Sequence, residues 1–579
     1  MAADTEYELH DYDVIVIGAG GAGLRAAIES SANGAKTALI CKSLLGKAHT
    51  VMAEGGVAAA LGNVEAEDNW QTHFQDTLFG GKYLNNWRMA ELHAKEAPDR
   101  VLELERWGGI FDRTPDGRMS QRAFGGHTHR RLVHIGDRTG LELIRTLQDR
   151  GVHQGIDVFM ECTVTSLLKD GDRVCGAFGY WRPSGQFVVF TAKSVVLATG
   201  GLGKGWRITS NSWEYTGDGH ALGYEAGAEL VDMEFVQFHP TGMIWPPGVV
   251  GLLVTEAVRG EGGILRNGDG ERFMERYDPK RMELSTRDVV ARAIYTEVTE
   301  GRGSPRGGVF LDVSHLSAAL VKKRLPSMYS QFMDLAGVDI TRAPMEVWPT
   351  CHYAMGGIKV DAETGASRVP GLFAAGECSG GMHGANRLGG NSLSDLLVFG
   401  KRTGEGAATQ AREAEPPRVD PAQVASAAGE MLRYLDGPGE DPFRLHTELQ
   451  DAMHENVGIF REESGLVQAL GALEALQRRV PNVRIASGGR EYNPGWHLCR
   501  ELQALMLVTE AVTRAALLRE ESRGAHSRLD FPATSDDWGD HNVVVSRGEG
   551  GTMRVERRDV VKVAELEPLV AARKAAEKV

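Results

Sequence analysis

The chain has 579 residues, of which 42% are hydrophobic and 25% are charged, and its formal net charge at pH 7 is −14. This length exceeds the roughly 250 to 300 residues at which a single core stops growing, so several packed units are expected. The acidic balance excludes a general nucleic-acid-binding protein, whereas the charged fraction is ordinary for a soluble globular chain.

The chain begins with an acidic segment, residues 1–6, and lacks the basic stretch that opens a secretory signal. No apolar run approaches the roughly 18 residues that cross a membrane as a helix. We therefore expect contact with a membrane only through partner proteins.

Residues 13–17 form a short β-branched run that ends at the glycine-rich loop 18–23, and residues 24–31 are predicted to be helical. This order of strand, tight turn and helix is typical of a dinucleotide site. Gly18, Gly20 and Gly23 permit the turn, the approach of a pyrophosphate and close helix packing, and the helix N-terminus supplies N–H groups.

The next predicted strand, residues 36–40, ends in Cys41, Lys42 and Ser43. An NAD site would carry an acidic residue at this place to bind the ribose. The lysine therefore disfavours NAD.

His49 and Thr50 open a run that continues to the turn Ala53-Glu54-Gly55-Gly56, whose glycines let the backbone approach a flat ring. This run resembles the flavin-linking motif His-Thr-x-x-Ala-x-Gly-Gly of the flavoprotein subunit of succinate dehydrogenase and fumarate reductase. The resemblance implies FAD bound covalently through His49. The family usually has Arg-Ser before the histidine, where this chain has Lys47-Ala48.

Two later segments, 194–201 and 371–377, are buried strands that run into glycine turns, a pattern of FAD-binding Rossmann-like proteins. The fold class that follows is α/β: an FAD-binding Rossmann-like domain with an inserted α+β capping domain, a helical domain and a small C-terminal region. The resemblance adds cofactor contacts at Lys42, Ser43, Asp218, Asn391, Ser392 and Leu393, and a ribose ligand at Glu377. The expected boundaries are 8–233 and 345–408 for the FAD-binding domain, 234–344 for the cap, 409–525 for the helical domain and 526–579 for the C-terminal region.

The helical domain is predicted from leucines at helical spacing. Pro416, Pro417 and Pro421 indicate the linker before it, and residues 437–439 a loop within it. Residues 521–532 match a family signature that opens the C-terminal region. The apolar positions are Leu466, Leu470, Leu473, Leu498, Leu502, Leu505 and Val512.

Four stretches place arginine, histidine and acidic side chains where a small dianion could be oxidised or reduced. They are residues 238–242, 255–263, 286–292, and the pair 352–357 with 386–393. Each alone has an ordinary explanation as a loop histidine or a surface ion pair. Together they match the family along nearly the whole chain.

Removing hydrogen from a saturated C4 diacid sends a hydride to flavin N5 and a proton to a base opposite the ring. Arginine binds carboxylates in bidentate fashion, and histidine and threonine add directional bonds. The resemblance implies that His239, Thr255, His352 and Arg387 bind the two carboxylates. It gives Arg287 the proton transfer, and Glu256 and Arg259 the proton path to solvent.

L-Aspartate oxidase is the nearest rival, since it shares the fold, the dicarboxylate grip and the signature at 521–528. That enzyme carries a glutamate before Gly125-Gly126 to meet the substrate ammonium, and it lacks the flavin-linking histidine. Here the residues are Phe124 and His49. A phenyl ring does not compensate an ammonium charge, so an amino diacid is disfavoured. A redox-silent FAD scaffold would be free to lose Arg287 and Glu256, and both are present.

The six cysteines contain no Cys-x-x-Cys pair, so neither a zinc site nor an iron–sulfur cluster is predicted. Their sparse use fits a reducing compartment. A tethered flavin cannot carry electrons away, and the next carrier must come from outside. The resemblance implies two kinds of partner, a membrane anchor and an iron–sulfur subunit, with this chain at the cytoplasmic face of the cell membrane.

Glu54 stands where family members devoted to ubiquinone-linked succinate oxidation commonly carry Gln and menaquinol-linked fumarate reductases commonly carry Glu. An ionised carboxylate beside the ring opposes the addition of electrons and lowers the flavin potential. This predicts a succinate:menaquinone complex able to run in either direction. The alternative is a Glu54 that is protonated or paired with Lys47, which leaves the potential unchanged.

Overall fold

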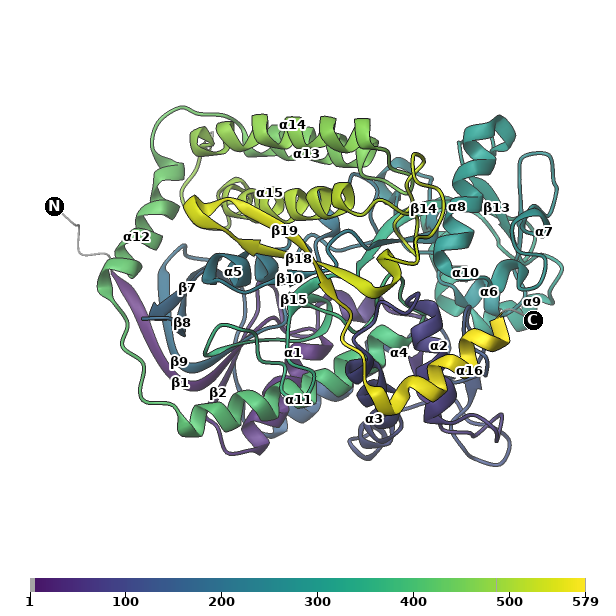
Figure 1. Cartoon of the computed structure of the whole chain (residues 1–579), viewed down its shortest axis with the longest axis horizontal. Coiled ribbons are helices and arrows are strands. Elements are labelled where there is room, and N and C mark those ends of the chain that lie inside the picture. The colour runs from purple at the N-terminus through teal and green to yellow at the C-terminus, as the bar shows by residue number, and fades with distance from the viewer. Residues whose placement is uncertain (1–5, 486, 578–579) are drawn as a thin grey trace.

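The computed structural model describes residues 6–485 and 487–577, and its central element is a seven-stranded sheet (Figure 1). The strand order is β6-β2-β1-β9-β8-β7, and β16 also pairs with β9. Strands β6, β2, β1, β9 and β16 are parallel, while β7 and β8 are antiparallel. The bounds are β1 (Tyr7–Ile17), β2 (Thr37–Ile40), β6 (Asp157–Phe159), β7 (Cys162–Asp170), β8 (Arg173–Trp181), β9 (Phe187–Leu197) and β16 (Leu372–Ala374).

This sheet confirms the predicted α/β nucleotide fold. Helix α1 (Gly21–Ala32) begins earlier than expected from the sequence, directly after Gly20. It packs closely on α11 (Asn391–Glu413), because a Cβ at Gly404 would lie 2.3 Å from the carbonyl oxygen of Ala26. A parallel sheet brings the carboxyl ends of its strands to one edge, where the cofactor site of such folds lies.

The insertion forms its own four-stranded sheet in the order β11-β14-β13-β12. Its last strand in the chain, β14, begins directly after the boundary expected at residue 344, so this strand of the insertion's sheet lies wholly outside the expected range. Its elements are β11 (Val236–Met243), α6 (Ala257–Gly260), β12 (Ile264–Arg266), α7 (Met274–Tyr277), α8 (Arg287–Glu297), β13 (Val309–Asp312), α9 (Ala318–Arg324), α10 (Pro326–Ala336) and β14 (Met345–Ala354).

The predicted helical domain is confirmed, and its predicted apolar positions are buried except for Leu470, which is half-buried. Leu466 and Leu473 of α14 and Leu502 and Leu505 of α15 are buried. Pro421 is the first residue of α12, where its fixed φ suits a helix start. Helix α11 continues past residue 408 to Glu413. The bounds are α12 (Pro421–Leu432), α13 (Pro442–Asn456), α14 (Glu463–Arg479) and α15 (Pro494–Leu518).

The C-terminal region adds two strands, β18 and β19, to a second sheet in the order β17-β15-β10-β18-β19. Helix α16 then lies beside α2 (Trp70–Gly80) (Figure 1). The bounds are α5 (Asp218–Ala226), β10 (Leu230–Val231), β15 (Gly357–Lys359), β17 (Ser379–Gly380), β18 (His541–Arg547), β19 (Met553–Asp559) and α16 (Glu567–Glu577).

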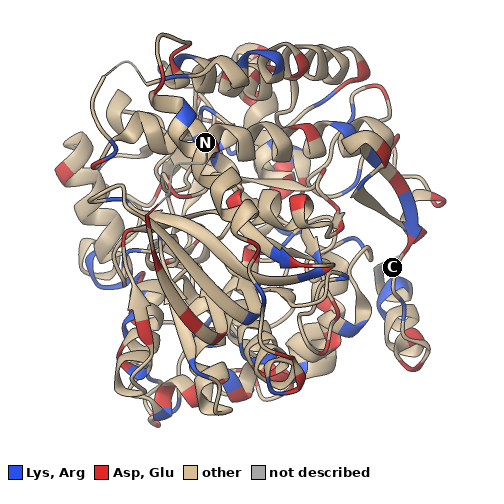
Figure 2. Cartoon of the chain, turned by 90° about the vertical axis from the view of Figure 1, so that its left-hand side faces the viewer, with Lys and Arg blue, Asp and Glu red and all other residues tan. Residues whose placement is uncertain are grey.

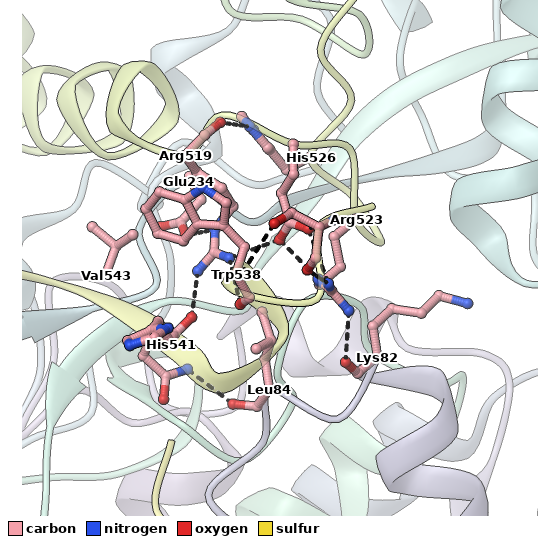
Figure 3. A network of polar contacts seen from close by, with 12 residues as sticks. Lys82, Leu84, Glu234, Arg519, Arg523, His526, Trp538, His541 and Val543 are labelled. Carbon is pink, nitrogen blue, oxygen red and sulfur yellow. Dashed lines mark hydrogen bonds and ion pairs between the residues drawn. The ribbon is translucent and has the colours of Figure 1, made fainter. Parts of the chain in front are cut away.

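The signature at 521–532 takes part in a buried network of ion pairs (Figure 3). Arg519 Nε lies 2.6 Å from Glu234, and Arg519 Nη1 lies 2.9 Å from Glu521. Arg523 pairs with the same Glu521 at 2.8 Å. Because Glu234 lies just before β11, the signature fixes the start of a strand that carries predicted site residues.

A small sheet contains β3 (Val57–Ala58), β5 (Leu132–Val133) and β4 (Gln121–Arg122), and β3 contacts α11. The helices of the same part of the chain are α2 (Trp70–Gly80), α3 (Trp87–Arg106) and α4 (Thr139–His153), and α3 also contacts α11. On the face seen in Figure 2, acidic and basic residues are intermingled along the outer elements. Within the described ranges, no helix is both long and apolar enough to cross a membrane.

Candidate active site

Most of the predicted site residues converge from distant segments on one cavity between the nucleotide domain and the cap. It begins at the N-terminus of α1 and ends beside α6, α8 and β14. The predicted residues that line it are Gly18, Gly20, Lys42, Ser43, His49, Thr50, Gly55, Gly56, Phe124, Asp218, His239, Thr255, Glu256, Arg287, His352, Glu377, Arg387, Ser392 and Leu393.

Three predicted residues do not line this cavity. A Cβ at Gly23 would lie 1.8 Å from the Gly18 carbonyl oxygen, so this glycine serves the helix packing. Arg259 lies behind Glu256 and donates to the Glu283 carbonyl at 2.6 Å. The side-chain amide of Asn391 bonds Thr77 at 3.0 Å and His73 at 3.0 Å on α2.

The end of the cavity at α1 is shaped for a nucleotide. Gly18 has φ +112°, and a Cβ there would lie 2.1 Å from the Ala198 carbonyl oxygen, so only glycine fits. Gly20 precedes α1 without a side-chain cap, which leaves the helix N-terminus to an anion. Glu377 is buried and accepts from the Ala354 N–H at 3.0 Å, and burial raises the pKa of its carboxyl.

Lys42 stands after β2, where an NAD site would carry an acidic residue, and it forms two ion pairs. Its Nζ lies 2.7 Å from Asp218 and 2.9 Å from Glu501. The lysine thus ties the second strand to α5 and α15, and it holds Asp218 at the wall of the cavity.

His49 lies in the short 3-10 helix η1 (His49–Met52), against the edge of Tyr215 with ring centroids 4.7 Å apart. The Gly21 N–H donates to Thr50 Oγ1 at 3.2 Å, which fixes η1 to the start of α1. Burial lowers the pKa of His49 to about 4. The imidazole is therefore neutral and has a free lone pair, as a nucleophile requires.

The glycine turn after η1 is held by Arg122, which the sequence did not single out. Its Nε donates to the Gly55 carbonyl at 2.7 Å and its Nη2 to the Glu54 carbonyl at 2.8 Å. A Cβ at Gly55 would lie 2.7 Å from the Phe124 ring, so the turn packs flat on that ring.

Burial and then Asp137 raise the pKa of Glu54 well above its usual value. A neutral Glu54 is thus favoured, and Lys47 is exposed.

At the opposite end, Gln237 joins Arg387 of the predicted dicarboxylate grip to Arg287, the predicted proton shuttle. Its Oε1 accepts from Arg287 Nη1 at 3.2 Å and from Arg387 Nη2 at 3.1 Å. Arg387 Nη1 also donates to Ser392 Oγ at 2.5 Å. The sequence offered one signal for Gln237: it stands two residues before His239, the spacing of one strand face.

His239 and His352 face each other with ring centroids 5.1 Å apart. His239 Nδ1 lies 2.9 Å from the Thr241 carbonyl oxygen and 3.3 Å from the Thr241 N–H, and the shorter contact assigns the proton to Nδ1. His352 Nδ1 lies 2.8 Å from Ser210 Oγ. Burial, followed by neighbouring positive or ionisable groups, lowers the pKa of both histidines well below the usual value. Both are neutral hydrogen-bonding groups.

Glu256 is the ionised carboxylate of this end. Its Oε2 accepts from Arg287 Nε at 2.7 Å and lies 3.7 Å from Arg259 Nη2. Burial acts to raise the pKa of Glu256, but Arg287 and Arg259 outweigh it and bring the pKa to about 2. Arg387 has no carboxylate within ion-pair distance among the described residues, and its Nε has no partner there. The end of the cavity is positive and suits a small anion with two carboxylates.

Comparison with known proteins agrees with this geometry. Residues 13–393 match the family model described as FAD binding domain, and residues 446–573 match Fumarate reductase flavoprotein C-term. A fumarate reductase (CoM/CoB) subunit of Methanothermobacter marburgensis is 46% identical, over 92% of this chain and 97% of that protein. A succinate dehydrogenase flavoprotein subunit of Coxiella burnetii is 40% identical, over 93% of this chain and 95% of that protein. A chain in the solved structure of Mycobacterium smegmatis Sdh1 in complex with UQ1 is 54% identical to this chain, and the two superpose with a TM-score of 0.88. The match covers 99% of this chain and 98% of the Sdh1 chain.

Proposed function

Because the chain belongs to the flavoprotein family of succinate dehydrogenases and fumarate reductases, we propose that it oxidises succinate to fumarate as the catalytic subunit of a succinate:quinone oxidoreductase. The observation that carries the proposal is the pair of arginines, Arg287 and Arg387, held on Gln237 beside the ionised Glu256. Fumarate reduction in the reverse direction is the second candidate, favoured by the 46% identity to a fumarate reductase subunit.

The residues present fit FAD. Gly18 and Gly20 leave room for a pyrophosphate at α1, and Glu377 and Asp218 supply acceptors for the ribose end. His49 would hold the isoalloxazine covalently. When bound, the flavin takes up the two electrons of the oxidation.

The chain's own residues bind the substrate and move its proton. His239, Thr255, His352 and Arg387 hold the two carboxylates, and the histidines do so as neutral groups. Arg287 relays the proton: its guanidinium passes a proton to Glu256 and takes the proton from the carbon next to the one that loses hydride. Glu256 is bonded to Arg287 and close to Arg259, so it passes the proton on toward solvent.

Phe124 supports a diacid without an amino group. Its ring is 3% exposed and packs between the glycine turn and Gly389. An apolar ring at this point has no charge to offer an ammonium group, so L-aspartate is the poorer substrate.

Electrons must leave through partners. Within the described ranges, no group of histidine, cysteine and acidic side chains is arranged to hold a metal, and the six cysteines are free and buried. We infer an iron–sulfur subunit docked on this chain and a membrane anchor beyond it, at the cytoplasmic face of the cell membrane. Solved relatives described as a quinol-fumarate reductase with menaquinol molecules and as Sdh1 with UQ1 support this arrangement.

The test of the proposal is reduction of the bound flavin in the absence of oxygen. We expect succinate to bleach the visible absorbance of the holoprotein and fumarate to restore it, because both diacids fit the same grip. L-Aspartate serves as the matched control and should leave the spectrum unchanged. Bleaching by L-aspartate but not by succinate would contradict the proposal.

The link to menaquinone depends on the charge of Glu54. A neutral Glu54 exerts no net charge on the ring, so we expect Glu54→Gln to leave the flavin potential unchanged in protein-film voltammetry. The raised pKa of Glu54 supports the uncharged alternative. The link to menaquinone stays a prediction, which this measurement tests. A rise in potential on substitution would instead indicate an ionised carboxylate and a menaquinone-linked enzyme.

A further inference from the structure

The loop that precedes α5 contacts two histidines of the site that come from different parts of the fold. Ser210 bonds the ring of His352, and Asn211 bonds the main chain of His352 and reaches His49. Asn211 is 6% exposed. This one side chain connects the residue expected to hold the flavin with a residue of the substrate grip.

The orientation of the Asn211 amide follows from its partners. Its nitrogen lies 2.9 Å from the His352 carbonyl oxygen, which can only accept, so an N–H must face that oxygen. The second N–H of the same nitrogen faces His49 Nε2 at 3.4 Å. A ring nitrogen opposite a donor must carry a lone pair.

This fixes the tautomer of His49. Burial keeps the imidazole neutral, so it has one proton to place on two nitrogens. With Nε2 as acceptor, the proton sits on Nδ1. That nitrogen is buried and has no hydrogen-bond partner among the described residues, so the choice of tautomer rests on Asn211.

We propose that Asn211 is a positioning residue for flavin attachment. It holds His49 in the tautomer that has its lone pair on Nε2, and it fixes the position of this ring relative to the main chain of His352. This rests on the proposed covalent FAD. Attachment joins His49 Nε2 to a methyl carbon of the isoalloxazine; that carbon gives up one proton and His49 Nδ1 gives up the other. The electron pair of the broken C–H bond reduces the flavin, and dioxygen or the proposed iron–sulfur partner then takes these two electrons. Once Nε2 is bonded to the flavin it can no longer accept a hydrogen bond, and Asn211 then donates only to the His352 carbonyl.

The decisive variant is Asn211→Asp, which has the same shape but presents an acceptor where the amide presents a donor. It would draw the His49 proton to Nε2 and block the lone pair. Asn211→Ser has a side chain too short to contact His49, so it removes the donor without putting an acceptor in its place. Ser212→Ala is the matched control, since the Ser212 hydroxyl bonds Glu214 at 3.5 Å in the same loop and not a site histidine.

The measurement is the fraction of flavin that stays on the polypeptide after acid denaturation, followed against time when the apoprotein is supplied with FAD. Reversibly bound FAD is measured on the same samples. We expect attachment about tenfold slower in Asn211→Ser, as the loss of one buried hydrogen bond implies, and abolished in Asn211→Asp, with FAD still bound. Ser212→Ala should match wild type.

Wild-type attachment rates in both Asn211 variants would overturn the inference. If Asn211→Asp binds no FAD, Asn211→Ser decides: slower attachment supports the role and an unchanged rate refutes it. A wild-type chain that loses all its flavin to acid would instead refute the covalent link in the proposed function, before any variant is compared.

Discussion

An Arg287→Gln variant is expected to lose succinate oxidation by about 10²- to 10⁴-fold, the range that a positioned acid or base contributes. Glutamine keeps a hydrogen-bonding amide near Glu256 and Gln237, but this amide cannot relay a proton from the substrate to Glu256. Binding of FAD should persist, because the cofactor contacts lie at the other end of the cavity. Binding of a dicarboxylate should weaken little, because Arg387 and the two histidines remain.

Steady-state rates, together with dicarboxylate affinity from the change in flavin spectrum, separate these effects. Arg306→Gln is a suitable control, since this exposed arginine pairs with Glu346 on the outside of the cap, where ion pairs contribute about 0 to 1 kcal/mol. Near-normal turnover in Arg287→Gln would assign the proton step to another residue. A variant that binds no dicarboxylate would give Arg287 a role in the grip.

The second large effect is expected for His49→Ser, which should release all of its flavin on acid precipitation while wild type retains it. Serine removes the neutral imidazole and its lone pair but leaves the glycine loop, Glu377 and Asp218 to bind FAD reversibly. Fluorescence of the denatured polypeptide in a gel measures the covalent fraction.

His315→Ser provides the control, because this histidine is exposed on the cap and is not part of the cavity lining. It should keep the full covalent fraction. The assignment of His49 fails if the wild type gives up all its flavin to acid, or if His49→Ser retains flavin on the chain.

The sequence by itself determined the features that depend on short-range geometry. The loop 18–23 predicts a pyrophosphate site because glycine alone tolerates its backbone angles and close contacts, and these constraints are local. The run from His49 to Gly56 and the motifs around Arg287 and Arg387 predicted a flavin site and a dicarboxylate grip in the same way. The helical spacing of Leu466 and Leu473 likewise predicted a buried helix face.

Only the tertiary structure decided which of these groups share partners and which carry charge. Gln237 bonds both arginines, although Arg287 lies 50 residues and Arg387 150 residues away in the sequence. Asn391 bonds α2 instead of the cavity. Burial and then Asp137 raise the pKa of Glu54 well above its usual value, because desolvation depends on what the whole fold places around a group. Residue type and spacing fix local backbone shape, whereas protonation and shared hydrogen bonds are set by neighbours that only folding brings together.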